Sequence, residues 1–79
     1  MARCILVVDD EPDLLELVRF NLDRAGFRVE TAASGEEALA RLRRSTPDLL
    51  VLDLMLPDLS GEEVCRRLRA DPSLAGLPV

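Results

Sequence analysis

Two apolar runs that each stop at carboxylates constrain the fold of this 79-residue chain more than any other feature. The first run, over residues 4–8, ends at Asp9 and Asp10, and the second, over residues 49–52, ends at Asp53. Short, nearly unbroken apolar runs are typical of strands that are covered on both faces in a parallel sheet. If the two strands lie side by side, they predict one acidic pocket where they end.

The chain between these runs has the pattern of helices and one exposed strand. Pro12, at a position favoured for the first residue of a helix, begins a segment that runs to Arg24 and ends before Gly26. Residues 27–33 alternate between apolar and polar, which is typical of a half-exposed edge strand. The predicted apolar stripe of the helix consists of Leu15, Val18 and Leu22, widened by Leu14 and Leu17.

The same four-residue signature, Ser-Gly-Glu-Glu, predicts the start of two further helices. It begins at Ser34 and again at Ser60, and in each case the serine is the predicted N-cap and the second glutamate completes a capping box. Thr46-Pro47 and Asp71-Pro72 end the two helices, because proline cannot continue a helix.

Strands that alternate with helices predict an α/β fold with a doubly wound parallel sheet and right-handed crossovers, in the order β-α-β-α-β-α. The alternating strand belongs at an edge, so the expected spatial order is 2-1-3. This order also puts residues 49–52 at an edge, although their sequence is that of an interior strand. Residues 77–79 resemble the start of a further strand. We therefore expect the chain to be the first part of a longer α/β domain.

Composition excludes several function classes. The net charge of −5 argues against nucleic acid as a direct partner, and the absence of histidine excludes a Ser-His-Asp triad and histidine metal sites. Cys4 and Cys65 lack C-x-x-C spacing and indicate reduced thiols in a cytoplasmic protein. No apolar run is long enough to span a membrane.

The ten basic residues are all arginine, and their helical clusters indicate either a solvated helix face or a docking surface for an acidic partner.

The three carboxylates form the candidate site. Neighbouring strands lie about 4.8 Å apart, so Asp9, Asp10 and Asp53 are expected within a few ångströms of one another. Two like charges about 4 Å apart repel by roughly 4 kcal/mol at an effective dielectric of about 20. A hard divalent cation such as Mg²⁺ would offset this repulsion. Simpler roles remain open: Asp10 as a helix cap and Asp53 as an acid that begins a loop.

Three motifs carry a family resemblance. They are I-L-V-V-D-D-E-P at residues 5–12, A-G-F-R-V-E-T-A-A-S-G-E-E-A-L at residues 25–39, and L-L-V-L-D-L-M-L-P-D-L-S-G at residues 49–61. Their order and spacing closely resemble the receiver domain of two-component response regulators. Within that family the chain is most similar to receivers that precede winged-helix DNA-binding domains. The resemblance implies a flavodoxin-like fold and a role in phosphorelay signalling.

The resemblance also implies a role for each site residue. Asp53 matches the aspartate that accepts a phosphoryl group from a sensor histidine kinase. Asp10 and Asp53 match the carboxylates that bind Mg²⁺ directly, and Asp9 matches the acid that holds the ion through water. Met55 matches the residue whose backbone carbonyl completes the metal site. Pro57 and Gly61 match residues that shape the loop beside the site.

The same resemblance sets the expected extent of the domain. A complete receiver continues through two more strands and two more helices, which carry the switch residues and a phosphate-pairing lysine. Residues 1–79 therefore correspond to the N-terminal two-thirds or so of one receiver, with DNA bound only through an output domain outside this chain.

Two other functions compete with the phosphoacceptor. An aspartyl-phosphate phosphatase of the haloacid dehalogenase type needs a second acid two residues after the nucleophile, where this chain has Met55. We therefore predict a phosphoacceptor that at most catalyses its own phosphoryl transfer and dephosphorylation, rather than an enzyme. The other alternative is a phosphorylation-incompetent module that forms a homodimer through the exposed strand at residues 49–52.

Overall fold

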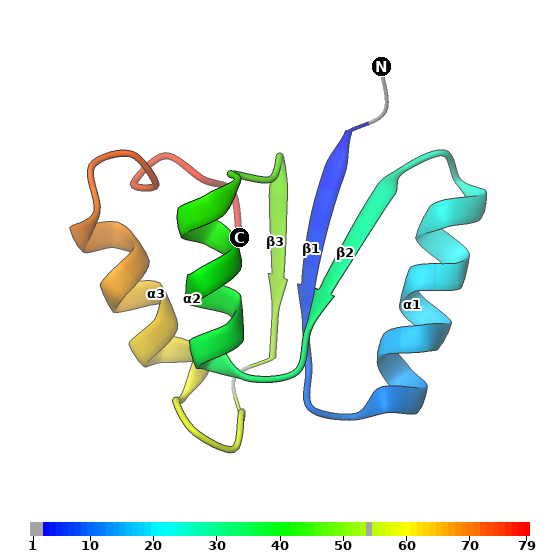
Figure 1. Ribbon diagram of the computed structural model, residues 1–79, viewed down its shortest axis with the longest axis horizontal. Helices are drawn as coiled ribbons and strands as arrows, with labels where there is room; N and C mark the ends of the chain where they lie inside the picture. Colours follow the sequence, from blue (N-terminus) through cyan, green and yellow to red (C-terminus); the bar gives the residue numbers. More distant parts are fainter. Residues whose placement is uncertain (1–2, 54) are drawn as a thin grey trace.

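The computed structural model describes residues 3–53 and 55–79 (Figure 1). Strands and helices alternate along the chain, as predicted. None of the helices in this part of the chain has the length and apolar character needed to cross a membrane. The elements are β1 (Cys4–Val8), α1 (Pro12–Arg24), β2 (Arg28–Ala32), α2 (Gly35–Arg44), β3 (Leu49–Leu52) and α3 (Gly61–Ala70).

The three strands form one parallel sheet in the order β2-β1-β3, which confirms the predicted topology. Val8, the last residue of β1, is level with Ala32 on one side and with Leu52 on the other. Two main-chain bonds extend these ladders: Asp9 N–H donates to Ala32 O at 3.1 Å, and Asp53 N–H donates to Val8 O at 3.0 Å. The strands therefore end together, and the residues that follow them start at the same edge of the sheet.

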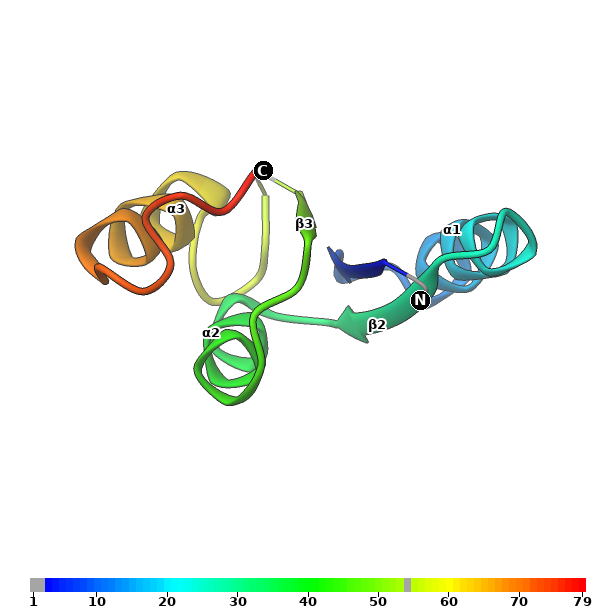
Figure 2. The same cartoon turned by 90° about the horizontal axis from the view of Figure 1, so that it is seen from above.

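The helices divide between the two sides of the sheet. Helix α1 lies on one side, and α2 and α3 lie on the other (Figure 2). The main core fills the space between the sheet and the helix pair α2 and α3. It consists of Leu6, Val8, Ala32, Ala38, Leu39, Leu42, Leu50, Val64, Leu68, Leu74 and Leu77.

Strand β1 is buried on both faces. Leu6 and Val8 belong to the main core, whereas Ile5 and Val7 are equally buried but stand outside that core cluster. Because side chains alternate along a strand, Ile5 and Val7 face the side on which α1 lies. The prediction of a fully covered central strand is confirmed for β1.

Strand β3 is only partly covered, so the prediction of a second fully buried strand is wrong. Leu50 is completely buried in the main core, but Val51 is 42% exposed and Leu49 and Leu52 are half-buried. Val51 points to the α1 side, where α1 packs against β1 and β2. Strand β3 is therefore more apolar than its partial burial among the described residues requires.

Helix α1 shows the same lack of cover. It begins with Pro12 and is followed by Gly26 at φ 97°, as predicted. Its predicted apolar stripe is only partly covered, because no residue of α1 is buried. Leu15, Val18 and Leu22 are half-buried, and Leu14 and Leu17 are exposed.

Both predicted serine caps are present. The Oγ atoms of Ser34 and Ser60 accept hydrogen bonds from the N–H groups of Glu37 and Glu63, each at 3.1 Å. In α2 the Glu37 carboxylate accepts from Ala33 N–H at 2.7 Å, so its return bond reaches the residue before the cap and not Ser34 as in the predicted capping box. These caps fix the two helix N-termini at the edge of the sheet where the strands end.

The arginines support the interpretation of a solvated helix face, since every one except the half-buried Arg41 is exposed. On α3, Arg66 and Arg67 both pair with Glu63 and lower the pKa of its carboxyl to about 2. The unfolded carboxyl titrates near 4.3, so this pairing contributes stability above that pH and loses it as the pH falls towards about 2. Cys4 and Cys65 are free thiols, as predicted.

The segment after α3 returns to the sheet. Leu77 is buried, and Leu50 N–H in β3 donates to Pro78 O at 3.0 Å. The Arg69 guanidinium holds the turn by donating to the carbonyls of Ala75 and Leu77 at 2.7 and 2.9 Å. Residues 77–79 thus lie along the outer edge of β3, where a further strand was expected, although they are not themselves a strand.

Burial predicts a sharp contrast between two leucines. Leu50→Ala leaves a cavity in the main core and should lower the free energy of unfolding by about 2–5 kcal/mol. Leu17→Ala, on a residue that is 58% exposed, should change it by about 0.5 kcal/mol or less. Urea denaturation followed by circular dichroism measures both, and equal losses would contradict the core described above.

Candidate metal centre

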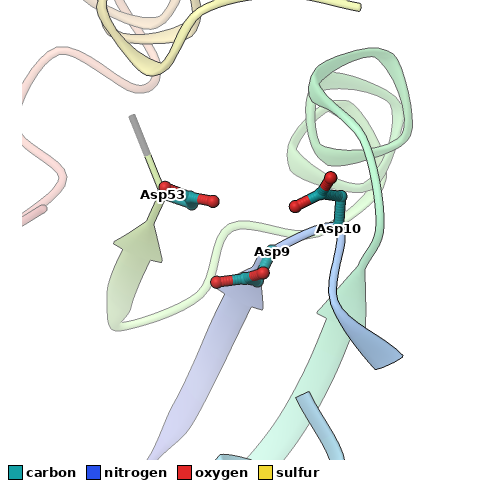
Figure 3. A group of neighbouring side chains, drawn as sticks. All are labelled: Asp9, Asp10 and Asp53. Carbon is teal, nitrogen blue, oxygen red and sulfur yellow. The ribbon is translucent and has the colours of Figure 1, made fainter. Parts of the chain in front are cut away.

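Three carboxylates converge at the edge of the sheet where β1 and β3 end. Asp9 and Asp10 follow β1, and Asp53 follows β3. One oxygen from each lies within 4.8 Å of the other two. Figure 3 shows the three side chains turned towards a common space between the two strand ends. The sequence-based prediction that these residues meet is therefore confirmed.

Two of the three acids are oriented by their own backbone. Asp9 Oδ1 accepts a hydrogen bond from Glu11 N–H at 2.9 Å, and Asp53 Oδ1 accepts from Met55 N–H at 3.1 Å. Each bond joins a carboxylate to the amide two residues later, as in an Asx turn. One oxygen of each carboxylate is thereby fixed, which leaves the other oxygen to face the common space.

Asp10 has a different environment. Its side chain is exposed, and none of its atoms has a hydrogen-bonding partner among the described residues. The N-cap of α1 is Glu11, so the alternative role of Asp10 as a helix cap is wrong. The structure thus gives the Asp10 carboxylate no local structural task.

The repulsion among the three acids is not offset by a neighbouring arginine. Within residues 3–53 and 55–79, every ion pair joins other acids: Glu16, Glu30, Glu36, Glu37 and Glu63. Hard oxygen donors clustered in this way match the ligands that Mg²⁺ prefers. The donor set therefore fits the predicted magnesium ion.

The carboxylates stand at the end of an apolar groove on the α1 side of the sheet. Asp9 and Asp53 line the groove together with apolar residues of α1, β1 and β3. The apolar lining consists of Val7, Val8, Leu14, Leu15, Val18, Val51 and Leu52.

The predicted backbone ligand, Met55, lies in the loop that follows the site. Its side chain is 83% exposed, which agrees with a role for its backbone alone. Met55 pairs with Ser60 as an isolated antiparallel bridge, so the loop between them closes on itself. Pro57 lies in this loop, and Gly61 is the buried first residue of α3. Coordination by the Met55 carbonyl stays a prediction.

One residue of this loop was not identified from the sequence. The Asp58 carboxylate accepts hydrogen bonds from the N–H groups of Gly35, Glu36 and Leu59 at 2.8, 2.9 and 2.9 Å. These bonds stabilise its charged form and lower the pKa of the Asp58 carboxyl. Two of the donors are more than twenty positions earlier in the chain, so no local sequence signal announces the contact.

Comparison with known proteins gives consistent matches. The family model for the response regulator receiver domain matches residues 5–79. The chain is 54% identical over 69 residues to the alkaline phosphatase synthesis transcriptional regulatory protein PhoP of Bacillus subtilis, a match that covers 87% of this chain and 29% of that protein. The chain thus spans less than a third of that curated relative.

Solved structures resemble the fold over nearly its full length. The N-terminal domain of a response regulator receiver protein from Methanoculleus marisnigri has a TM-score of 0.95 at 40% identity, and the match covers all of this chain and 64% of that one. The Thermotoga maritima response regulator protein TrrA, solved in complex with Mg²⁺-BeF, has a TM-score of 0.84 at 41% identity, over 90% of this chain and 62% of that one.

Charge repulsion within the cluster predicts that removing one acid stabilises the metal-free protein. Asp10→Asn should raise the free energy of unfolding by about 1 kcal/mol, the repulsion of two unit charges about 4 Å apart in water. The gain should shrink in high salt. Asp13→Asn, in the first turn of α1, should instead destabilise slightly because a helix N-terminus favours an acid. Urea denaturation in EDTA measures both, and a loss for Asp10→Asn would contradict the repulsion.

Proposed function

Because this chain belongs to the response regulator receiver family, we propose that it acts in a phosphorelay and accepts a phosphoryl group on Asp53 from a sensor histidine kinase. The observation that carries the proposal is the meeting of Asp9, Asp10 and Asp53 at the end of two parallel strands. Ligand sites in such sheets lie beyond the carboxyl ends of the strands.

The proposed cofactor is Mg²⁺. Asp10 and Asp53 would hold it directly, Asp9 through water, and the Met55 carbonyl would complete the set. The oxygen donors of the cluster support this assignment, as does the complex with Mg²⁺-BeF in the similar Thermotoga maritima protein. When bound, the ion supplies positive charge that offsets the negative charge on the transferring phosphoryl group.

The residues of the chain position the nucleophile. Asp53 Oδ1 is held by the Met55 N–H group, so Oδ2 is the oxygen that attacks phosphorus. A bond forms between Oδ2 and phosphorus while the bond from phosphorus to the kinase histidine nitrogen breaks, and its electron pair stays on that nitrogen. The product is an aspartyl phosphate. Holding the attacking oxygen in place is most of what such a transfer requires.

The chain is proposed as a phosphoacceptor and not as an enzyme that turns over a substrate. Its output would be regulation of transcription through a DNA-binding domain outside this chain, since the similar Bacillus subtilis protein is a transcriptional regulator. The free thiols of Cys4 and Cys65 suit the reducing cytoplasm, where the kinase partner would meet it.

Residues 1–79 are proposed as the N-terminal part of one receiver domain. The exposed side chains of Leu14, Leu17 and Val51 support this, because they form an apolar surface on one side of the sheet. The fourth and fifth strands and helices of the receiver would cover that surface and the outer edge of β3. The match to only 64% of the Methanoculleus marisnigri domain agrees with this proposal.

Phosphorylation tests the main proposal. A full-length protein that contains this chain should gain the mass of one phosphoryl group when it is incubated with acetyl phosphate and Mg²⁺. The gain should be lost in Asp53→Asn and on removal of Mg²⁺ by EDTA, and it should persist in the control variant Asp13→Asn. Intact-protein mass spectrometry measures all four samples. A mass gain that survives Asp53→Asn would refute the assignment of the acceptor.

The exposed edge of β3 favours a second candidate function, assembly of the chain into a homodimer. Among residues 3–53 and 55–79, one main-chain bond, from Leu50 N–H to Pro78 O, covers this edge, so the rest of it and the exposed Val51 can meet a second copy. If so, Val51→Lys should shift the 79-residue chain from dimer to monomer in sedimentation equilibrium. Ala40→Lys, at an exposed position on α2, should not. A wild-type monomer at high concentration would rule out this candidate.

A further inference from the structure

We propose that Asp58 is a positioning residue that ties the loop after the phosphoacceptor to the N-terminus of α2 and so holds the Met55 backbone at the metal site. The inference rests on the proposed function, because it concerns the same site. The hydrogen bonds of Asp58 come from Gly35, Glu36 and Leu59, and none of them involves the acidic cluster. Its effect is exerted through the loop.

The anchor consists of three main-chain bonds to one carboxylate. Oδ1 accepts from Gly35 N–H at 2.8 Å and from Leu59 N–H at 2.9 Å, and Oδ2 accepts from Glu36 N–H at 2.9 Å. Gly35 and Glu36 begin α2, so their N–H groups have no partner inside the helix. Both oxygens are therefore engaged, and the negative charge lies at the positive end of the helix dipole.

Close packing reinforces these bonds. A Cβ atom built on Gly35 would lie 2.8 Å from Leu59 Cβ and 3.1 Å from a methyl group of Val64. Leu59 and Leu56 pack from the loop against the main core. The loop tip and the start of α2 are thus in contact through both polar and apolar groups, and no side chain larger than that of glycine fits between them.

The anchored loop connects directly to the site. Met55 and Ser60 pair across the base of the loop, and Asp58 lies between them at its tip. Met55 N–H donates to the Asp53 carboxylate, and Ser60 caps α3. A loop held at its tip and its base has few ways to move, so the Met55 backbone and the Asp53 carboxylate keep their place relative to Asp9 and Asp10.

The test uses Asp58→Ala and the milder Asp58→Asn, which keeps one acceptor oxygen. Asp58→Ala should weaken Mg²⁺ binding, measured by isothermal titration calorimetry, by about tenfold, as is usual for residues that orient metal ligands. Asp58→Asn should give a smaller loss. Without Mg²⁺, Asp58→Ala should also speed hydrogen exchange of the Met55 amide, measured by NMR. Gly35→Ala, which pushes Leu59 away, should act in the same direction.

Asp71→Ala is the matched control. The Asp71 carboxylate also accepts a main-chain hydrogen bond, from Ser73 N–H at 3.0 Å, but Asp71 is the C-cap of α3. The C-terminal end of α3 lies at the end of the sheet opposite to the strand ends that carry the site (Figure 1). The Asp71→Ala variant should lose stability without a change in its Mg²⁺ affinity or in the hydrogen exchange of the Met55 amide.

Wild-type values in both assays for Asp58→Ala would overturn the inference. If that variant does not fold, wild-type values for Asp58→Asn and Gly35→Ala would overturn it. Should the wild-type protein bind no Mg²⁺, the proposed function fails and Met55 exchange alone decides the role of Asp58.

Discussion

Parallel pairing of β3 and β2 with the buried strand β1 is the constraint on which the rest of the structure depends. It fixes Val8 level with Leu52, and two further main-chain bonds carry the alignment to Asp9 and Asp53. A slip of one residue would turn Leu6 and Val8 out of the main core, so burial and the position of the acids are specified together. The positions of the acids are well defined because β1, which is buried over Ile5–Val8, fixes the alignment of both neighbouring strands.

The same constraint explains why we expect the site to cost stability. Register places three carboxylates within 4.8 Å, and no ion pair in the described part of the chain offsets their charge. Part of the repulsion is tolerated because Asp10 is exposed to solvent. Backbone N–H groups hold Asp9 and Asp53, which resists their turning away from one another. The arrangement offers oxygen ligands to the proposed divalent cation at the point where the proposed phosphoryl group would carry further negative charge.

Local signals made most of this predictable. Apolar runs identified β1 and β3, alternation identified β2, and the Ser34 and Ser60 caps marked two helices within a residue of their observed starts. The convergence of the acids followed from topology alone. Burial was harder to predict, because the apolar pattern of α1 and β3 shows which surfaces need cover and not which neighbours provide it. Val51 and Leu17, for example, have apolar side chains but are exposed.

The contacts of Asp58 could not be predicted from the sequence. Its partners, Gly35 and Glu36, become neighbours only after α2 and the β3–α3 loop have been brought to the same edge of the sheet. The capping boxes contribute indirectly, since each sets a helix N-terminus at that edge. The acids at the strand ends supply the ligands, and the helix N-termini supply the N–H groups that hold the loop beside them. A parallel α/β sheet brings both to one edge, so its topology builds the site and its support together.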